Sequence, residues 1–407
     1  MAHIFLSYAR EDIETAKRLA AVLRARGWEV WWDTRLKAGE VWDEVIERAL
    51  EGACCVLVLW SGISINKRWV RAEASSGLER GILVPALIEG VRPPLIFRSV
   101  QHEDLTGWAG DDDHLSLLRL LDAVSGFVVP GPPPVVPAPP PFAHASGKDG
   151  FGRWIDVAVP SGEFSGLVVQ RFRWIEPGTF LMGSPDDEAE REDWEGPRHR
   201  VTLTRGLWLA DTACTQALWR AVMGETPSRF KGDTLPVETV SWNDALTFLS
   251  RLKDKVSGLD PRLPTEAQWE YACRAGTGTP FSFGAQITPD QVNYDGNYPY
   301  AGGNRGVRRG MTVPVKSLPP NAWGLYEMHG NVWEWCADGL RRYTAEPQVD
   351  PVGELGGGDA ALRAVRGGSW YGHAWWVRSA YRLAALPGLA DFSLGFRLSL
   401  SVCPRRC

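Results

Sequence analysis

The stretch Asn321-Ala-Trp-Gly-Leu-Tyr-Glu-Met-His-Gly-Asn-Val-Trp-Glu-Trp335 decides how the C-terminal part of the chain is interpreted. Short apolar runs, turns, glycine and tryptophan dominate around it, and clear helical patterns occur only near Thr215–Met223 and Trp242–Lys253. A third helix is predicted within Pro264–Cys273, where Thr265 is suited to cap the first turn. Large aromatic side chains must stabilise so much turn, and we therefore predict an irregular α+β module.

Three other segments have the same character. They are Trp174-Ile-Glu-Pro-Gly-Thr-Phe-Leu-Met-Gly-Ser184, Arg262-Leu-Pro-Thr-Glu-Ala-Gln-Trp-Glu-Tyr-Ala272, and Arg366-Gly-Gly-Ser-Trp370 continued by Leu394-Gly-Phe-Arg397. Together the four segments resemble the formylglycine-generating enzyme family, also called sulfatase-modifying factor. The resemblance covers about residues 165–400 and implies a variant of the C-type lectin fold.

Members of that family oxidise a substrate cysteine with copper, which two cysteines hold after the Gly-Gly-Ser-aromatic turn. A soft Cu(I) ion requires thiolate ligands. The matching positions in this chain are Gly372 and Val377, neither of which can ligate copper. We therefore expect no copper and no formylglycine synthesis from this module.

The same resemblance implies a calcium site at Glu327, Gly330, Val332 and Glu334, built from two side-chain oxygens and two backbone carbonyls. Hard oxygen ligands suit calcium. In the alternative interpretation, Trp333 and Trp335 pack inside the module while the two glutamates face solvent.

The region 366–398 also resembles the variable proteins of diversity-generating retroelements, which display randomised side chains on this fold. Adenine mutation in AAC-type codons yields NNC codons, and most positions between Tyr371 and Ser393 carry residues that such codons encode; Trp375 and Trp376 do not. The alternative is a fixed receptor with an inactivated pocket. Either interpretation predicts one ligand-binding face, made of Tyr371, Gly372, His373, Trp375, Trp376, Leu383, Ala384, Ala385, Leu386, Leu389, Ala390, Asp391, Phe392 and Ser393.

The N-terminal part alternates short apolar runs with amphipathic helices. Such alternation predicts a parallel sheet that helices cover on both faces, with ligands at the carboxyl ends of the strands. The expected strands are Ile4–Ser7, Trp28–Trp32, Cys54–Trp60 and Ile82–Ile88, and the expected helices are Ile13–Arg26 and Trp42–Leu50.

Three motifs refine this interpretation: Phe5-Leu-Ser-Tyr-Ala-Arg-Glu-Asp12, Trp28-Glu-Val-Trp-Trp-Asp33 and Trp69-Val-Arg-Ala-Glu73. They resemble a bacterial TIR domain, which has a flavodoxin-like sheet, over about residues 1–125. A response-regulator receiver has the same architecture. However, it requires acidic residues where this chain has Ser7-Tyr8 and Trp60-Ser61.

Many TIR domains hydrolyse NAD, and the resemblance gives Glu73 the position of their catalytic glutamate. A carboxylate can stabilise the oxocarbenium character that develops when the nicotinamide–ribose bond breaks. The resemblance also implies that Tyr8, Ala9 and Arg10 line the nucleotide pocket and that Asp33–Val41 mediates contacts between TIR domains. The alternative for Glu73 is a solvated residue on a helix of a silent scaffold.

Pro130-Gly-Pro-Pro-Pro-Val-Val-Pro-Ala-Pro-Pro-Pro141 favours an extended polyproline spacer between the two parts. We therefore divide the chain into a TIR domain at residues 1–125, a linker at 126–160 and a ligand-binding domain at 161–407. The formal net charge of -5 disfavours nucleic acid as a partner, and no long apolar run predicts a membrane span. Seven cysteines, an odd number, argue against a disulfide framework.

These features predict a cytoplasmic receptor and effector. The C-terminal module binds an unknown protein ligand, and the TIR module signals by self-association and by NAD hydrolysis. The main alternative is a pure TIR adaptor with a fixed, catalytically inactive C-terminal module.

Overall fold

The computed structural model describes residues 3–32, 42–111, 114–128, 139–161, 166–353 and 361–400. The chain divides into two compact units, Met1–Val136 and Pro137–Cys407. The predicted contact loop Asp33–Val41 and most of the proline-rich stretch lie outside the described residues.

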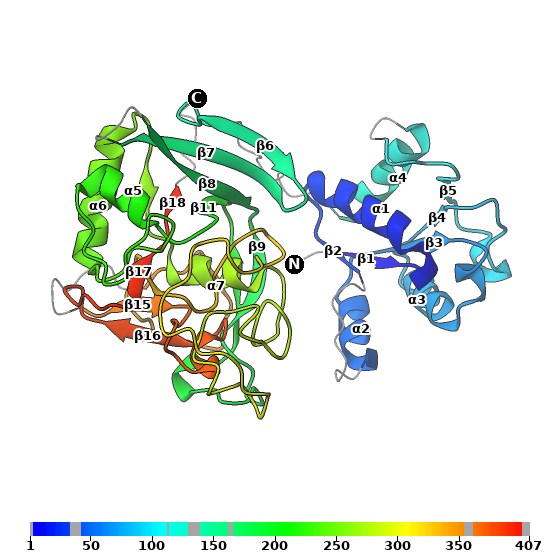
Figure 1. Cartoon of the computed structure of the whole chain (residues 1–407). Helices are drawn as coiled ribbons and strands as arrows, with labels where there is room; N and C mark the ends of the chain where they lie inside the picture. The colour runs from blue at the N-terminus through cyan, green and yellow to red at the C-terminus, as the bar shows by residue number, and fades with distance from the viewer. Residues whose placement is uncertain are drawn as a thin grey trace. The chain divides into compact units, whose positions relative to one another are not determined.

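The first unit is built on a five-stranded parallel sheet with the strand order β2-β1-β3-β4-β5 (Figure 1). Strands and helices alternate along the chain up to β4, and β5 then follows β4 without an intervening α-helix. The elements are β1 (Ile4–Ser7), α1 (Ile13–Ala25), β2 (Val30–Trp31), α2 (Trp42–Glu51), β3 (Cys55–Trp60), α3 (Arg68–Glu79), β4 (Leu83–Leu87), β5 (Glu103–Asp104) and α4 (Leu115–Ser125). The predicted parallel α/β architecture is confirmed.

Both faces of this sheet are buried, because successive residues of a strand point to opposite sides. Cys55, Leu57 and Leu59 of β3 pack with apolar residues of α1 and α4. Val56, Val58 and Trp60 of the same strand pack with α2 and α3. Helix α3 lies so close to β3 that a Cβ on Gly77 would come within 2.8 Å of the Val56 Cβ.

Over its described residues, the second unit combines three sheets with three α-helices. A six-stranded sheet has the order β12-β18-β11-β8-β7-β6, a three-stranded sheet has β14-β10-β9, and a four-stranded sheet has β16-β15-β13-β17. The helices are α5 (Gln216–Met223), α6 (Trp242–Lys255) and α7 (Glu266–Arg274). Side chains of Thr215, Ser241 and Thr265 cap their first turns, so the predicted helix starts are confirmed.

The strands of this unit are short. They are β6 (Ala145–Asp149), β7 (Gly152–Pro160), β8 (Leu167–Ile175), β9 (Gly178–Met182), β10 (His199–Leu203), β11 (Leu207–Ala210), β12 (Pro261–Arg262), β13 (Trp333–Trp335), β14 (Gln348–Val349), β15 (Arg363–Arg366), β16 (Arg382–Ala385), β17 (Leu394–Phe396) and β18 (Ser399–Leu400). Strands β6 and β7 fall within residues 126–160, which the composition assigned to the linker. Regular structure therefore begins earlier in the chain than the proline content suggested.

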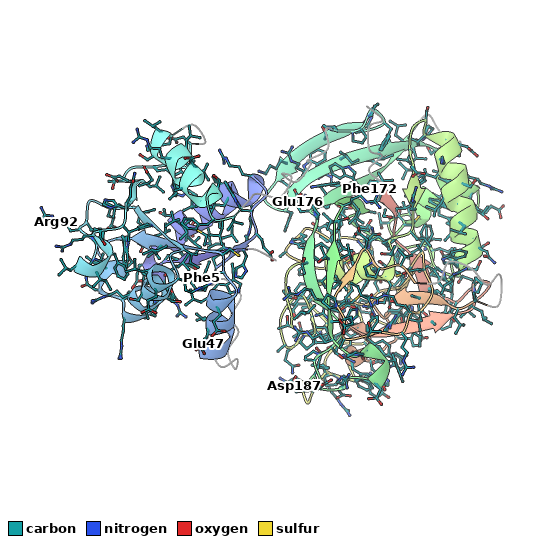
Figure 2. All side chains as sticks on the ribbon, turned by 180° about the vertical axis from the view of Figure 1, so that it is seen from behind. Phe5, Glu47, Arg92, Phe172, Glu176 and Asp187 are labelled. Atoms are coloured by element: carbon teal, nitrogen blue, oxygen red, sulfur yellow. The ribbon has the colours of Figure 1, made fainter. Side chains whose placement is uncertain are left out.

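Figure 2 contrasts the core and surface side chains of each unit. Phe5 and Phe172 are almost fully buried, whereas Arg92, Glu176 and Asp187 are exposed. Within the described residues, no helix is both long and apolar enough to cross a membrane. The cysteines in the same ranges, Cys54, Cys55, Cys214, Cys273 and Cys336, are free thiols.

Candidate functional site

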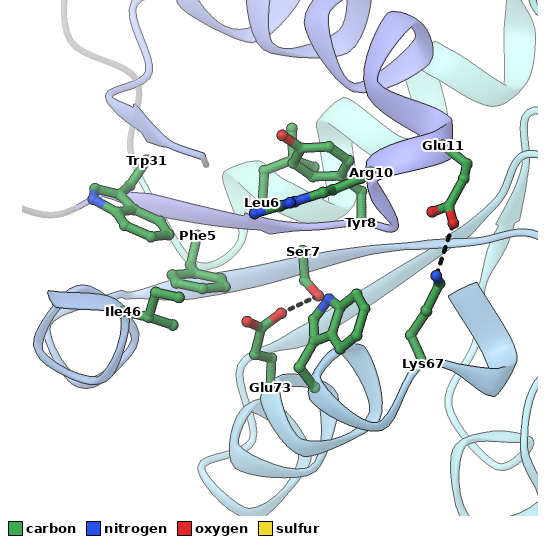
Figure 3. Close-up of a pocket in the computed structure, with 11 residues that line it drawn as sticks. Phe5, Leu6, Ser7, Tyr8, Arg10, Glu11, Trp31, Ile46, Lys67 and Glu73 are labelled. Atoms are coloured by element: carbon green, nitrogen blue, oxygen red, sulfur yellow. Dashed lines mark hydrogen bonds and ion pairs between the residues drawn. The ribbon is translucent and has the colours of Figure 1, made fainter. Parts of the chain in front are cut away.

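A cavity of about 610 Å³ opens at the carboxyl end of β1 (Figure 3). Here the strand order reverses, because β2 lies on one side of β1 and β3 on the other. In open α/β sheets, ligands bind at such a switch point, outside the carboxyl ends of the strands. The lining residues are Phe5, Leu6, Ser7, Tyr8, Arg10, Glu11, Trp31, Ile46, Lys67, Trp69 and Glu73.

Glu73 is held in this cavity by the last residue of β1. The Ser7 hydroxyl donates a hydrogen bond of 2.5 Å to Glu73 Oε2, and the carboxylate is partly buried on α3. The α3 helix therefore presents Glu73 to the crevice, so Glu73 is not on an outer, solvated face. One carboxylate oriented by a hydroxyl donor can stabilise a developing positive charge.

Charged and aromatic groups surround this pair. Lys67 Nζ lies 2.7 Å from Glu11 Oε1, and this hydrogen bond holds the pKa of Glu11 below its ordinary value. Lys67 also lies 5.2 Å from the centre of the Trp69 ring. Phe5 stacks on Trp31 with their ring centres 4.8 Å apart. The cavity thus offers flat aromatic faces together with both signs of charge.

Two of the three predicted nucleotide-pocket residues, Tyr8 and Arg10, line the cavity. Ala9 is fully buried and is not part of the lining; its carbonyl accepts a hydrogen bond from the Asp12 amide. Ser7, Lys67 and Trp31 were not predicted as site residues. The rule that ligands gather at strand ends could have identified Ser7, whereas Lys67 and Trp31 reach the cavity through tertiary packing.

In the second unit, the positions of the copper-binding cysteines are occupied by packing groups. Val377 is fully buried in an apolar cluster with Phe281, Tyr294 and Ala374. Gly372 is also buried, and a Cβ there would lie 3.2 Å from Ser369 O and 3.3 Å from Trp376 Cε3. The residues present do not fit a copper site.

His329 stabilises this region as a neutral imidazole. Its Nδ1 lies 2.7 Å from the Val377 carbonyl and its Nε2 accepts a hydrogen bond from the Ser282 amide, while burial lowers its pKa to about 4. The nearby Cys273 thiol lies 3.6 Å from Nε2, and burial raises its pKa to about 12. The thiol is therefore protonated at neutral pH, which does not favour binding of a soft metal.

In the predicted calcium segment, the two glutamates accept hydrogen bonds from other groups of the protein. Arg397 donates to both oxygens of Glu334, and Trp269 Nε1 donates to Oε2 at 2.7 Å. Glu327 accepts from the Lys316 and Leu318 amides. Both glutamates are buried, so they do not face solvent, and Trp333 and Trp335 pack in the core.

In this arrangement the charge of Glu334 is balanced by Arg397, and burial raises the pKa of Glu327 to about 7, so neither glutamate offers a full, unpaired negative charge at neutral pH. The arrangement therefore does not fit the implied donor set, although Gly330 and Val332 lie in the same segment. Calcium binding by Glu327, Gly330, Val332 and Glu334 stays a prediction. Elsewhere in the described ranges, no group of three or more His, Cys, Asp or Glu residues is arranged to hold a metal ion.

Most of the predicted ligand-binding face is accessible. Of its residues, Leu383, Leu386, Leu389 and Ala390 are exposed, and seven others are partly exposed: Tyr371, His373, Trp375, Trp376, Ala384, Asp391 and Phe392. Gly372, Ala385 and Ser393 are buried. These three residues therefore offer little surface to a ligand, and ligand binding by the face stays a prediction.

The aromatic residues of this face form two groups. The ring centres of Tyr371 and Phe392 lie 5.7 Å apart, and the Arg229 guanidinium carbon lies 5.2 Å from the centre of the Phe392 ring. In the second group, His373 stacks on Trp376 with their ring centres 4.8 Å apart. The ring centre of His373 also lies 4.1 Å from that of Tyr298. Arg229 and Tyr298 come from segments outside 366–398, and no local sequence pattern predicted their contribution.

Beneath this face, four arginines of the same region pair with glutamates in the interior. Arg366 pairs with Glu270, Arg378 with Glu195 and Glu188, Arg382 with Glu266, and Arg397 with Glu334. Each guanidinium is almost fully buried. Removing one partner of such a pair strands a buried charge and typically costs about 3–5 kcal/mol, so these pairs fix the backbone that carries the face.

The site and the fold thus define a parallel α/β module with a carboxylate in its switch-point crevice, joined to an irregular α+β module with an aromatic face. Comparison with known proteins agrees with both parts. The model of the TIR domain family matches residues 4–121, and the model of the sulfatase-modifying factor enzyme 1-like domain matches residues 165–402. The chain therefore belongs to the sulfatase-modifying factor family and carries a TIR domain at its N-terminal end.

Among curated relatives, the formylglycine-generating enzyme of Streptomyces coelicolor is 38% identical over 192 residues, which cover 44% of this chain and 57% of that protein. The inactive C-alpha-formylglycine-generating enzyme 2 of Mus musculus is 33% identical over 194 residues, covering 45% and 56%. The chain spans a little over half the length of these relatives. Treponema denticola variable protein 1, a solved structure, is 28% identical with a TM-score of 0.49, covering 60% of this chain and 98% of that one.

Proposed function

We propose that the chain is a receptor and effector whose TIR module hydrolyses NAD when copies of it assemble, in response to a protein ligand bound by the C-terminal module. The single observation that carries the enzymatic part is the placement of Glu73 beside Ser7 in the switch-point cavity. General TIR function supports association between copies, and the fusion itself couples that association to a second domain.

The proposed reaction breaks the bond between the nicotinamide nitrogen and ribose C1′. The bonding electrons pass to the already cationic pyridinium ring, which leaves as neutral nicotinamide, and water adds to C1′ with loss of a proton. Glu73 stabilises the oxocarbenium character of C1′, and Ser7 keeps the carboxylate in one orientation. Arg10 and Lys67 supply positive charge for the diphosphate, and Trp31 and Trp69 supply faces for the two rings.

The C-terminal module is proposed to bind without catalysing an oxidation. Gly372 and Val377 cannot replace the copper thiolates, and a family member that is named inactive supports the use of this fold without that chemistry. The exposed aromatic and leucine side chains between Tyr371 and Phe392 are of the kind that dominates protein interfaces. A protein ligand suits this broad face better than a small molecule does.

Nicotinamide release tests the enzymatic proposal. Purified full-length chain is incubated with NAD, either dispersed or clustered by a bivalent antibody against an N-terminal tag. We expect release from the clustered wild type and at least about a hundredfold less from Glu73→Gln, because the variant lacks the charge that stabilises the transition state. Glu79→Gln, a matched change of an exposed glutamate on the same helix, should keep full activity.

No release from the clustered wild type, or equal release from Glu73→Gln, would overturn NAD hydrolysis. The alternative of a TIR adaptor would then be favoured. Clustering that leaves the rate of an active wild type unchanged would instead remove the requirement for self-association.

A further inference from the structure

A second cavity, of about 730 Å³, lies wholly within the C-terminal unit. One wall contains Arg191 and Trp194, from the loop that carries the short 3-10 turn Asp193–Glu195. The opposite wall contains Arg341, Arg342 and Tyr343, which follow β13. Neither wall includes a residue of the predicted ligand-binding face or of the predicted metal sites.

Arg382 holds the two walls together. Its Nη1 donates to the carbonyl of Trp194 at 3.4 Å and to the carbonyl of Arg341 at 3.0 Å. Its charge is already balanced, because Nε donates to Glu266 at 2.7 Å. The guanidinium also lies 3.9 Å from the centre of the Tyr343 ring. The cavity is therefore preformed, and Arg382 shapes it without being the cation left for a ligand.

Two polar atoms of residues that line this cavity are buried and have no hydrogen-bond partner within the described part of the chain. They are the Tyr343 hydroxyl, on a side chain that is 4% exposed, and Arg341 Nε. Buried polar groups are almost always paired, so each such atom calls for a physical explanation. A phenol hydroxyl and a guanidinium N–H can both donate, which makes an acceptor the missing group.

The charges at the cavity also favour a ligand that carries acceptor atoms, because the cavity is rich in arginine. Arg341 Nη atoms contact the neutral groups of Gln348, Met182 and His199, and no acidic partner of Arg341 or Arg342 occurs among the described residues. Asp186 and Asp193 lie 3.6 and 3.9 Å from Arg191, and both carboxylates are fully exposed to water, so they offset little of this charge.

We propose that this cavity binds a small organic anion. Its carboxylate or phosphate oxygens accept hydrogen bonds from Tyr343 and from Arg341, and Arg342 adds a second positive charge. Its apolar part lies against Trp194 and Leu340, which present half-exposed and exposed apolar surface at the same cavity. The ligand thereby supplies the acceptor that the two unpaired donors lack.

Calorimetric titration of the full-length chain with benzoate and with phenyl phosphate tests this proposal. We expect at least one probe to bind, and we expect Arg342→Ala and Tyr343→Phe each to weaken that binding about tenfold, as loss of a charge-assisted contact does. Arg342 is exposed, and Tyr343→Phe keeps the buried ring, so both variants should fold. Arg251→Ala, which removes an exposed arginine on α6 outside the cavity, is the matched control and should bind like the wild type.

The probes also identify the acidic group. Binding of phenyl phosphate alone assigns a phosphate ligand, binding of benzoate alone assigns a carboxylate, and either result supports the site. Failure of both probes to bind overturns the proposal, as does equal affinity in wild type, Arg342→Ala and Tyr343→Phe. Tight binding of inorganic phosphate, with no gain from the phenyl group, overturns the role of Trp194 and Leu340.

Discussion

Asp338 illustrates how a single buried carboxyl makes the stability of the C-terminal module depend on pH. It accepts hydrogen bonds of 2.7 Å from the amides of Glu266 and Gly353, yet burial is the dominant effect and raises its pKa from 3.8 to about 6. The native state therefore holds a proton on Asp338 between about pH 4 and 6, where the unfolded state has lost it. This contribution to stability is complete below pH 4 and is lost as the pH rises through 6.

We therefore expect the free energy of unfolding of the wild type, relative to Asp338→Asn, to increase by about 2 kcal/mol as the pH falls from 6.5 to 4. Urea unfolding at a series of pH values measures this difference. The other titrating groups are the same in both proteins, so their contributions cancel in the difference between the wild type and Asp338→Asn. A difference that does not change with pH would contradict the raised pKa of Asp338.

At the scale of single residues, prediction succeeded where a motif carried the chemistry. Glu73 was assigned from the Trp69–Glu73 motif, and the structure places it in the cavity as expected. Its catalytic role stays a prediction. The fate of Glu334 could not be foreseen, because its partner Arg397 is 63 residues away in the sequence and an ion pair at that separation depends on the tertiary fold. Gly372, Ala385 and Ser393 were included in the predicted ligand-binding face because their codon type allows variation. Codon type carries no information on whether a residue is buried.

At the scale of elements, the short 3-10 turn Ala374–Val377 depends on Arg378, which follows it. Arg378 donates to Glu195 and Glu188 at 2.6–2.7 Å and to the Trp375 carbonyl at 3.0 Å, and it is fully buried. Replacing it leaves two buried carboxylates without their cation. We expect Arg378→Met to lower the free energy of unfolding by about 3–5 kcal/mol, measured by urea unfolding.

Arg220→Met is the matched control for Arg378→Met. Arg220 pairs with Asp233 at 2.8 Å, but both side chains are substantially exposed, so its loss should cost less than about 1 kcal/mol. Similar losses in the two variants would contradict a structural role for the buried pair. Faster amide hydrogen exchange in Trp375–Val377 of Arg378→Met would locate the effect in the turn.

The helices that the sequence predicted, α1, α2, α5, α6 and α7, agree with the structure to within one or two residues, because apolar periodicity and capping side chains mark helix ends. Helices α3 and α4 were not predicted. The largest difference between the predicted and the observed secondary structure concerns β6 and β7, which were assigned to the linker. The prolines before them are a strong local signal, whereas β6 exposes all five of its residues and has no apolar alternation. Its strand conformation comes from pairing with β7, which is a tertiary effect that the local pattern does not contain.

At the scale of the whole molecule, the two-module organisation followed from composition, since the N-terminal alternation of strands and helices contrasts with the turn-rich remainder. The family comparisons confirm both domains. The function of the fusion depends on its partners, and the fold of one chain does not specify these.

The resemblance of residues 366–398 to diversified variable proteins makes a prediction about the gene. The accessible positions from Tyr371 to Phe392 surround a buried framework of Arg366, Arg378, Arg382 and Arg397. We expect the DNA near the gene to contain a near-repeat of the codons for residues 366–398, with adenines at the accessible positions other than Trp375 and Trp376, and with unchanged codons at the four arginines. A reverse-transcriptase gene should lie beside it. Sequencing the locus checks both points, and absence of the repeat would leave a fixed receptor.

The buried pairs of these four arginines bear on how freely the region can be exchanged between proteins. All their glutamate partners, Glu188, Glu195, Glu266, Glu270 and Glu334, lie outside residues 366–398. A homologous region transplanted from another protein would therefore meet the same five carboxylates, whatever its accessible residues are. A transplanted region should therefore fold in this protein if it keeps arginine at the positions of Arg366, Arg378, Arg382 and Arg397. The rest of the C-terminal unit would then accept foreign recognition segments of the same length.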